Sequence, residues 1–161
     1  MRLAEQTKIV PLIAPADYNA SGKDSDSFSM ENYGHATILL IFGTLVANSD
    51  LVVYEGAAVG EKTTEINFSY RWTSAVIEAA ADADKLVAEV KTTVAATGLE
   101  LTGASYANFM LVIEIDDSEL TDGYPWITLA IDGDATTLFM SAVAILSQPR
   151  YAQNVPPTAI V

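Results

Sequence analysis

The chain has 161 residues, half of them hydrophobic, and its 21 acidic and 8 basic residues give a formal charge of −13. The hydrophobic content excludes a disordered chain, and the length suits one domain with a sizeable core. The basic residues are scattered and there is no cysteine, so we expect no direct nucleic-acid binding, no disulfide and no thiolate chemistry.

The first 24 residues are predicted to form an extended arm that carries one edge strand. Residues 8–14 are mostly apolar, but Pro11 interrupts them and Pro15 follows. Proline lacks the amide proton that a central strand must donate, so this segment belongs at the edge of a sheet. Polar residues follow Arg2, and we therefore predict no export signal.

Residues 36–46 are predicted to form a buried strand, because the apolar run from 36 to 47 spans only 12 residues. A membrane helix needs about 20, so we expect no membrane span. A turn at 48–50 is predicted to lead into a strand at 51–54. Residues 62–73 then alternate strictly between apolar and polar side chains, which is the period of a half-buried strand.

The segment from 75 to 97 fits two patterns. Its alanines and valines recur near helical spacing, with Ala, Glu and Lys to support a helix. Alternation in its second half, with consecutive threonines, favours a strand instead. We predict a short helix or loop near 75–83 and a strand from about 85 to 95.

Three apolar and β-branched runs complete the predicted sheet, at 107–115, 126–131 and 138–146. The fold class is therefore mainly all-β: an antiparallel β-sandwich or jelly-roll-like domain over residues 25–148, with one short helix at most. Residues 149–161 contain three prolines and are predicted to form a second extended arm.

Few residues are suited to catalysis. His35 is the only histidine, with Asp26, Ser27 and Ser29 nearby in sequence, but the strained Gly-x-Ser-x-Gly turn of many hydrolases is missing. We predict that His35 caps local backbone at the start of a strand. We predict no catalytic residue, and the chain is not expected to be an enzyme.

Carboxylates gather in two places, and both are interpreted as solvated turns. One group contains Asp116, Asp117, Glu119 and Asp122, and the other Asp132 and Asp134. Adjacent residues of a strand point to opposite faces, so Asp116 and Asp117 cannot share one site there. Neither group matches the twelve-residue calcium loop, and we predict no metal and no cofactor.

An aromatic set allows two interpretations. The residues Phe68, Tyr70, Trp72, Tyr124 and Trp126 could form a platform for stacking sugars, but aromatic side chains at strand spacing are more often part of a core. The two arms carry apolar side chains that should not remain in water. We predict that these contact a neighbouring subunit or another protein: Ile9, Val10, Leu12, Ile13, Val155, Ile160 and Val161.

Several segments resemble small virion proteins encoded beside the capsid genes of tailed bacteriophages. They include residues 112–116 (Val-Ile-Glu-Ile-Asp), 119–120, 123–125 (Gly-Tyr-Pro) and 141–151, together with 16–19 through 32–37. Within that group the resemblance implies a head decoration, or cement, protein. Such proteins are typically β-sandwich or jelly-roll modules, often trimeric, that sit on the capsid at junctions between hexamers.

The resemblance thus implies a non-enzymatic structural protein on the surface of the virion, assembled in the host cytoplasm. Its partners would be further copies of itself, as a trimer, and the major capsid protein. A tail-tube or head–tail connector subunit remains an alternative within the virion. A carbohydrate-binding β-sandwich that uses Tyr124 and Trp126 is the alternative outside it.

Overall fold

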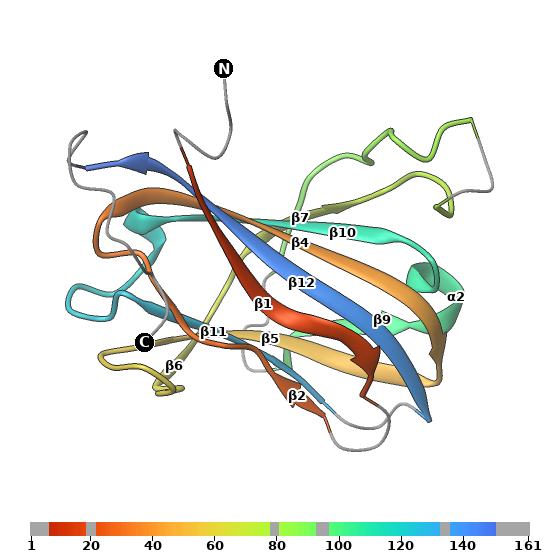
Figure 1. Cartoon of the computed structure of the whole chain (residues 1–161), viewed down its shortest axis with the longest axis horizontal. Coiled ribbons are helices and arrows are strands. Elements are labelled where there is room, and N and C mark those ends of the chain that lie inside the picture. Colours follow the sequence, from red (N-terminus) through yellow and green to blue (C-terminus); the bar gives the residue numbers. More distant parts are fainter. Residues whose placement is uncertain (1–6, 19–21, 78–80, 93–96, 133–135, 151–161) are drawn as a thin grey trace.

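The computed structural model of the protein describes residues 7–18, 22–77, 81–92, 97–132 and 136–150. They form two six-stranded sheets in which all paired strands are antiparallel. The sheets pack against each other as two layers (Figure 1). The predicted all-β sandwich is confirmed.

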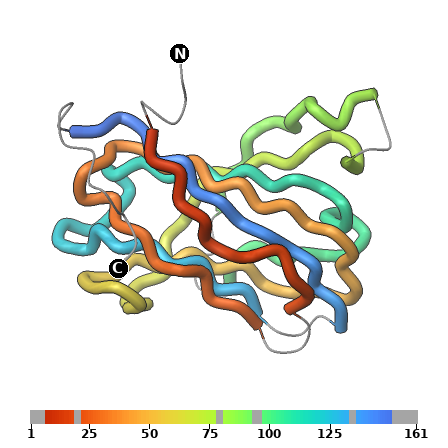
Figure 2. Tube along the Cα trace, in the orientation of Figure 1, coloured from red at the N-terminus to blue at the C-terminus, as the bar shows by residue number. Residues whose placement is uncertain are grey.

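The first sheet has the strand order β1-β12-β4-β10-β7-β8. In that order its strands are β1 (Lys8–Asp17), β12 (Thr137–Pro149), β4 (Tyr33–Val46), β10 (Met110–Asp116), β7 (Ser69–Trp72) and β8 (Val90–Lys91). The N-terminal strand β1 runs beside the C-terminal strand β12, so the two ends of the described chain share one edge of this sheet (Figure 2).

The second sheet has the order β2-β11-β5-β6, with β3 also paired to β11 and β9 to β5. Its strands are β2 (Lys23–Asp24), β3 (Phe28–Ser29), β5 (Asn48–Gly56), β6 (Thr64–Ile66), β9 (Leu99–Thr102) and β11 (Trp126–Ile131). The described residues also contain two single turns of helix, α2 (Gly103–Tyr106) and η2 (Asp117–Glu119). No helix in the described residues is long and apolar enough to span a membrane.

The core lies between the two sheets and consists of alternate residues of each strand. On β10 and its neighbour β4, Ile113, Ile115, Ile38 and Leu40 have no exposed surface. Because successive side chains of a strand point to opposite faces, this alternation fixes which residues face outward. Ile113 and Ile115 therefore face the core, whereas Glu114 between them faces the polar side and binds His35.

The alternating segment 62–73 forms two strands rather than one. Its first part is β6 in the second sheet, and its last part is β7 in the first sheet. Ile66, Phe68 and Tyr70 are all buried, as the alternation predicted. Inward-facing residues point to the same core from either sheet, so their spacing does not reveal where the chain changes sheet.

The predicted turn at 48–50 is wrong, because these residues belong to β5 and pair with β9. The chain turns one residue earlier. Ala47 is the only residue between β4 and β5, and its φ of 70° lies in the left-handed region. This residue carries the chain from the first sheet directly into the second.

The predicted strand at 85–95 is largely wrong. Its described part contains only the two-residue β8 and an isolated bridge between Thr73 and Leu86. Residues 75–77 and 81–83 form bends and turns instead of a helix, and 78–80 and 93–96 lie outside the described residues. Leu86 and Val90 are 41% and 38% exposed. The apolar spacing here therefore does not correspond to a face packed on the core, and the segment projects from the sandwich (Figure 1).

Candidate binding surface on the outer face of the first sheet

The outer face of the first sheet is unusually apolar. Across its centre, one row of directly paired residues runs from Pro11 on β1 through Val143, Leu39 and Val112 to Arg71 on β7. A sheet face that meets water normally carries polar side chains. In this row the only charged side chain is the arginine at its end.

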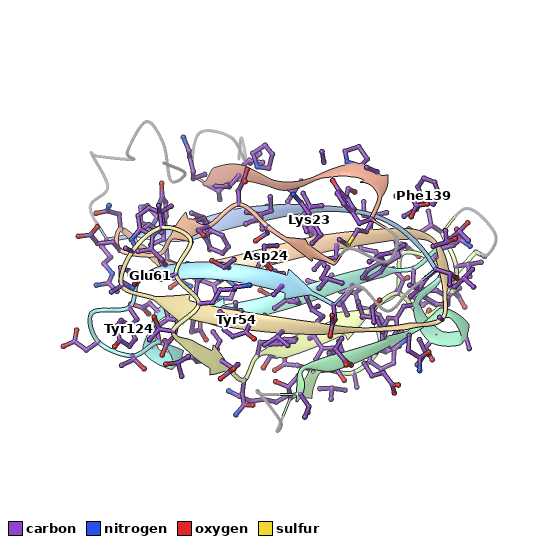
Figure 3. The ribbon with its side chains drawn as sticks, turned by 90° about the horizontal axis from the view of Figure 1, so that it is seen from below. Lys23, Asp24, Tyr54, Glu61, Tyr124 and Phe139 are labelled. Carbon is purple, nitrogen blue, oxygen red and sulfur yellow. The ribbon has the colours of Figure 1, made fainter. Side chains whose placement is uncertain are left out.

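Neighbouring positions enlarge this patch. Ile9, Ile41 and Phe139 are 44%, 46% and 47% exposed. Phe139 points away from the ribbon (Figure 3) and lies beside a β-bulge in β4, where Gly43 leaves room for its side chain. We call the outward-facing apolar side chains of this sheet the apolar face: Ile9, Pro11, Leu39, Ile41, Met110, Val112, Phe139, Val143 and Ile145. Val112 is only 5% exposed, because its neighbours on the same face cover it, and the others are exposed or partly exposed. Exposed apolar patches of this kind commonly mark interaction sites.

The edges of both sheets are poorly suited to pairing with another chain. In the described residues, the outermost strands β2, β3, β6, β8 and β9 have only two to four residues. The longer edge strand β1 contains Pro11 and Pro15, which cannot donate to a ladder. Short strands and prolines are common ways of protecting an edge. Association is therefore directed to the faces of the sandwich.

A charged cluster closes one end of the apolar face. His35 on β4 lies directly opposite Asp116 on β10, and Thr37 lies opposite Glu114. The imidazole Nδ1 is 2.8 Å from Asp116 Oδ1, and Nε2 is 2.7 Å from Glu114 Oε2. The Thr37 hydroxyl also donates to Glu114, at 2.9 Å. His35 thus bridges two strands, and the predicted capping of local backbone is wrong.

The protonation of His35 follows from these partners. Ionised carboxylates only accept hydrogen bonds, so both ring nitrogens must donate, and only the imidazolium has two N–H groups. Partial burial lowers the pKa of His35, but hydrogen bonds and charge from Asp116 and Glu114 outweigh it and raise the pKa above 6.5. His35 is therefore a cation that links β4 to β10.

Stability should fall as the pH rises through the pKa of folded His35. The folded pKa is raised, so the stabilisation is complete below the unfolded value of about 6.5 and disappears above the folded one. Urea unfolding between about pH 6 and pH 9 should therefore show a decreasing free energy of unfolding. Since His35 is the only histidine, His35→Gln should remove most of this slope; an unchanged slope in the variant would contradict the assignment.

The carboxylates near 116–122 are largely paired rather than simply solvated. Asp117 pairs with Arg150 and Glu119 with Lys91, while Asp116 binds His35. Asp116 and Asp117 indeed serve different partners, as their positions predicted. No group of three or more His, Asp or Glu side chains in the described ranges is arranged to hold a metal ion.

The hydroxyl groups of the serines near His35 in sequence bind other partners in the structure. Asp132 follows β11, and Asp134 lies outside the described residues. The Ser27 hydroxyl is 2.7 Å from that of Thr128 and accepts from the Gly60 amide, and the Ser29 hydroxyl accepts from the Glu31 amide. These serines therefore hold local structure in the described part of the chain.

The aromatic set divides into two groups. Phe68, Tyr70 and Trp72 pack in series, with the rings of Tyr70 and Trp72 stacked at a centroid distance of 5.9 Å. Phe68 and Tyr70 are buried, so this group belongs to the core. Tyr124 and Trp126 are partly exposed and instead line a cleft at one end of the sandwich.

The predicted contact residues of the N-terminal arm have two different environments. Val10, Leu12 and Ile13 are 1%, 3% and 4% exposed and pack in the core of their own chain, so their burial requires no partner. Ile9 belongs to the apolar face. Val155, Ile160 and Val161 lie outside the described residues.

The surface residues of the His35 cluster and of the apolar face were not predictable from the sequence pattern alone. The pairing of His35 with Glu114 and Asp116 had a signal, because two acidic residues two positions apart share one face of a strand. It could not be used without knowing that β4 and β10 are neighbours. The apolar face could not be recognised in the sequence, because an almost continuous apolar run is typical of a strand that is buried on both faces of its sheet.

Comparison with models of known protein families and with curated proteins found no match to this sequence.

Proposed function

We propose that this chain is a non-enzymatic structural protein that decorates the capsid of a tailed bacteriophage and docks on the major capsid protein through the apolar face. The exposed apolar side chains on the outer side of the first sheet, Ile9, Pro11, Ile41 and Phe139, are the observation that carries this proposal. The resemblance of the sequence to small virion proteins supplies the identity of the partner.

The distribution of charge around the apolar face supports docking through this face. Copies with a formal charge of −13 repel one another in solution, whereas the side chains of the apolar face carry no charge. Its flanking charges are largely compensated, since Arg71 pairs with Glu89 and His35 with Glu114 and Asp116. Burying apolar surface contributes about 25 cal/mol per Å², and a lattice of such contacts adds avidity.

A charge placed on the apolar face should abolish capsid binding. Ile41→Asp would bury an unpaired carboxylate in the contact, which is strongly unfavourable. We expect at least about a hundredfold weaker binding to heads purified from phage that lack this gene. Occupancy of the heads is measured by co-sedimentation.

Val59→Asp is the matched control. Val59 is 45% exposed, against 46% for Ile41, but it lies in the loop after β5 rather than on the apolar face. Like Ile41→Asp, this variant replaces a β-branched apolar side chain with a carboxylate. It should bind heads as the unmodified chain does. Equal occupancy by both variants, each shown to be folded by circular dichroism, would refute docking through the apolar face.

We further propose that the decorating unit is a trimer. A native mass three times that of the chain supports it, whereas rings or tubes of the free protein would favour the tail-tube or connector alternative. The same measurement on chains lacking residues 1–24 or 152–161 tests the predicted arms; removal of 1–24 also removes β1, so folding must be verified first.

A further inference from the structure

A second surface feature lies outside the apolar face. A cleft of about 600 Å³ opens where the loop between η2 and β11 meets the segment between β3 and β4, the residue after β5 and the residue after β12. This volume is within the usual range of small-ligand sites, about 300–1,000 Å³. Figure 3 shows Tyr124 in that loop, at one end of the sandwich.

Two aromatic side chains form part of the lining. Trp126 begins β11, and the next residue, Ile127, is fully buried, so Trp126 lies on the outer side of the second sheet. Its partner across the ladder is Gly56, which has no side chain to cover the indole. Among the described residues, neither the Trp126 indole N–H nor the Tyr124 hydroxyl has a hydrogen-bond partner. Both rings are partly exposed in the cleft.

Polar side chains complete the lining. Glu31 and Asp122 are exposed carboxylates, and Arg150 lies beside Asp117. Carboxylates accept from hydroxyl groups, and the planar guanidinium donates in a fixed fork. Aromatic faces beside such groups match a ligand with apolar C–H faces and a hydroxyl-rich edge.

The loop that carries Tyr124 is anchored to the sandwich. The Glu55 side chain on β5 is only 1% exposed and accepts a 2.7 Å hydrogen bond from the Thr121 amide as well as one from its hydroxyl. At the other end, Met30 donates its amide to the Pro125 carbonyl at 2.8 Å. A cleft held in this way is largely formed before a ligand arrives, which lowers the ordering cost of binding.

From these observations we infer that the cleft binds a short neutral oligosaccharide, an activity separate from capsid docking. Sugar rings stack on Tyr124 and Trp126, while their hydroxyl groups bond to Glu31, Asp122 and Arg150. Among the described residues of the lining, three carboxylates outnumber one guanidinium, so anionic glycans are repelled. A wholly apolar ligand would leave these carboxylates buried without partners.

The test combines a glycan array with NMR titration of the full-length chain by maltotriose, cellotriose and N-acetylchitotriose. At least one neutral glycan should bind, and Tyr124→Ala should weaken it by about tenfold or more. Trp126→Ala should do the same if circular dichroism shows it folded. Glu31→Gln keeps the side-chain size and should weaken binding less.

Tyr54→Ala is the matched control, because Tyr54 is a partly exposed tyrosine of the second sheet that lies outside this cleft. It should bind as the unmodified chain does, and so should Ile41→Asp, which separates this site from capsid docking. The inference is overturned if no neutral glycan binds at about 10 mM, if only acidic glycans bind, or if Tyr124→Ala and Tyr54→Ala behave alike.

Discussion

Ile113→Ala should lower the free energy of unfolding by about 2–5 kcal/mol, the usual cost of truncating a buried isoleucine to alanine. Ile113 has no exposed surface and sits on the central strand β10, between β4 and β7. The lost side chain leaves a cavity that neighbours on both strands cannot fill without moving backbone. Urea unfolding monitored by tryptophan fluorescence measures the difference.

Ile41→Ala is the control, because it removes the same atoms from a side chain that is 46% exposed on the adjacent strand β4. Its cost should be below about 1 kcal/mol. Similar losses in the two variants would mean that the inner and outer faces of the first sheet are exchanged.

Gly98→Ala should also be severely destabilising, by roughly 2–5 kcal/mol. Gly98 has a φ of +68°, and a Cβ atom there would lie 2.4 Å from the Leu51 carbonyl oxygen and 2.7 Å from Val52 Cγ2. The added methyl group would push β9 away from β5, where Leu99 pairs with Leu51. Both backbone strain and a steric clash therefore oppose the substitution.

Gly60→Ala separates these two causes. Gly60 has a similar φ of +77°, but no atom lies within 4 Å of the position of a Cβ. Only the backbone strain should remain, at about 1–2 kcal/mol. Thermal unfolding of both variants gives the comparison, and a loss at Gly60 as large as that at Gly98 would rule out the clash with β5.

Strand positions were predictable wherever an apolar run was bounded by turn residues. The strands at 36–46, 126–131 and 138–146 correspond to β4, β11 and β12, because long apolar runs of β-branched residues have few alternatives to a buried strand. Which sheet a strand joins was not predictable. The direct passage from β4 to β5 at Ala47 depends on one residue with a positive φ, which leaves no sequence signal in an alanine.

The candidate sites show the same division. Tyr124 and Trp126 were recognised from their residue types and lie together at a cleft. The cluster of His35, Glu114 and Asp116 depends on the register between two strands about 80 positions apart, which periodicity alone does not determine. Glu55 was overlooked for a related reason, since a carboxylate in an apolar strand has a clear role only once its distant partner Thr121 is known.

The protected sheet edges also determine how this protein can polymerise. A fibril grows when an exposed edge strand is long enough to pair with a strand of the next chain, which then exposes a new edge. The edge strands of two to four residues and the prolines of β1 in the described chain offer a poor template of this kind. Growth by strand addition, one chain after another, is therefore disfavoured at the edges of the described sheets.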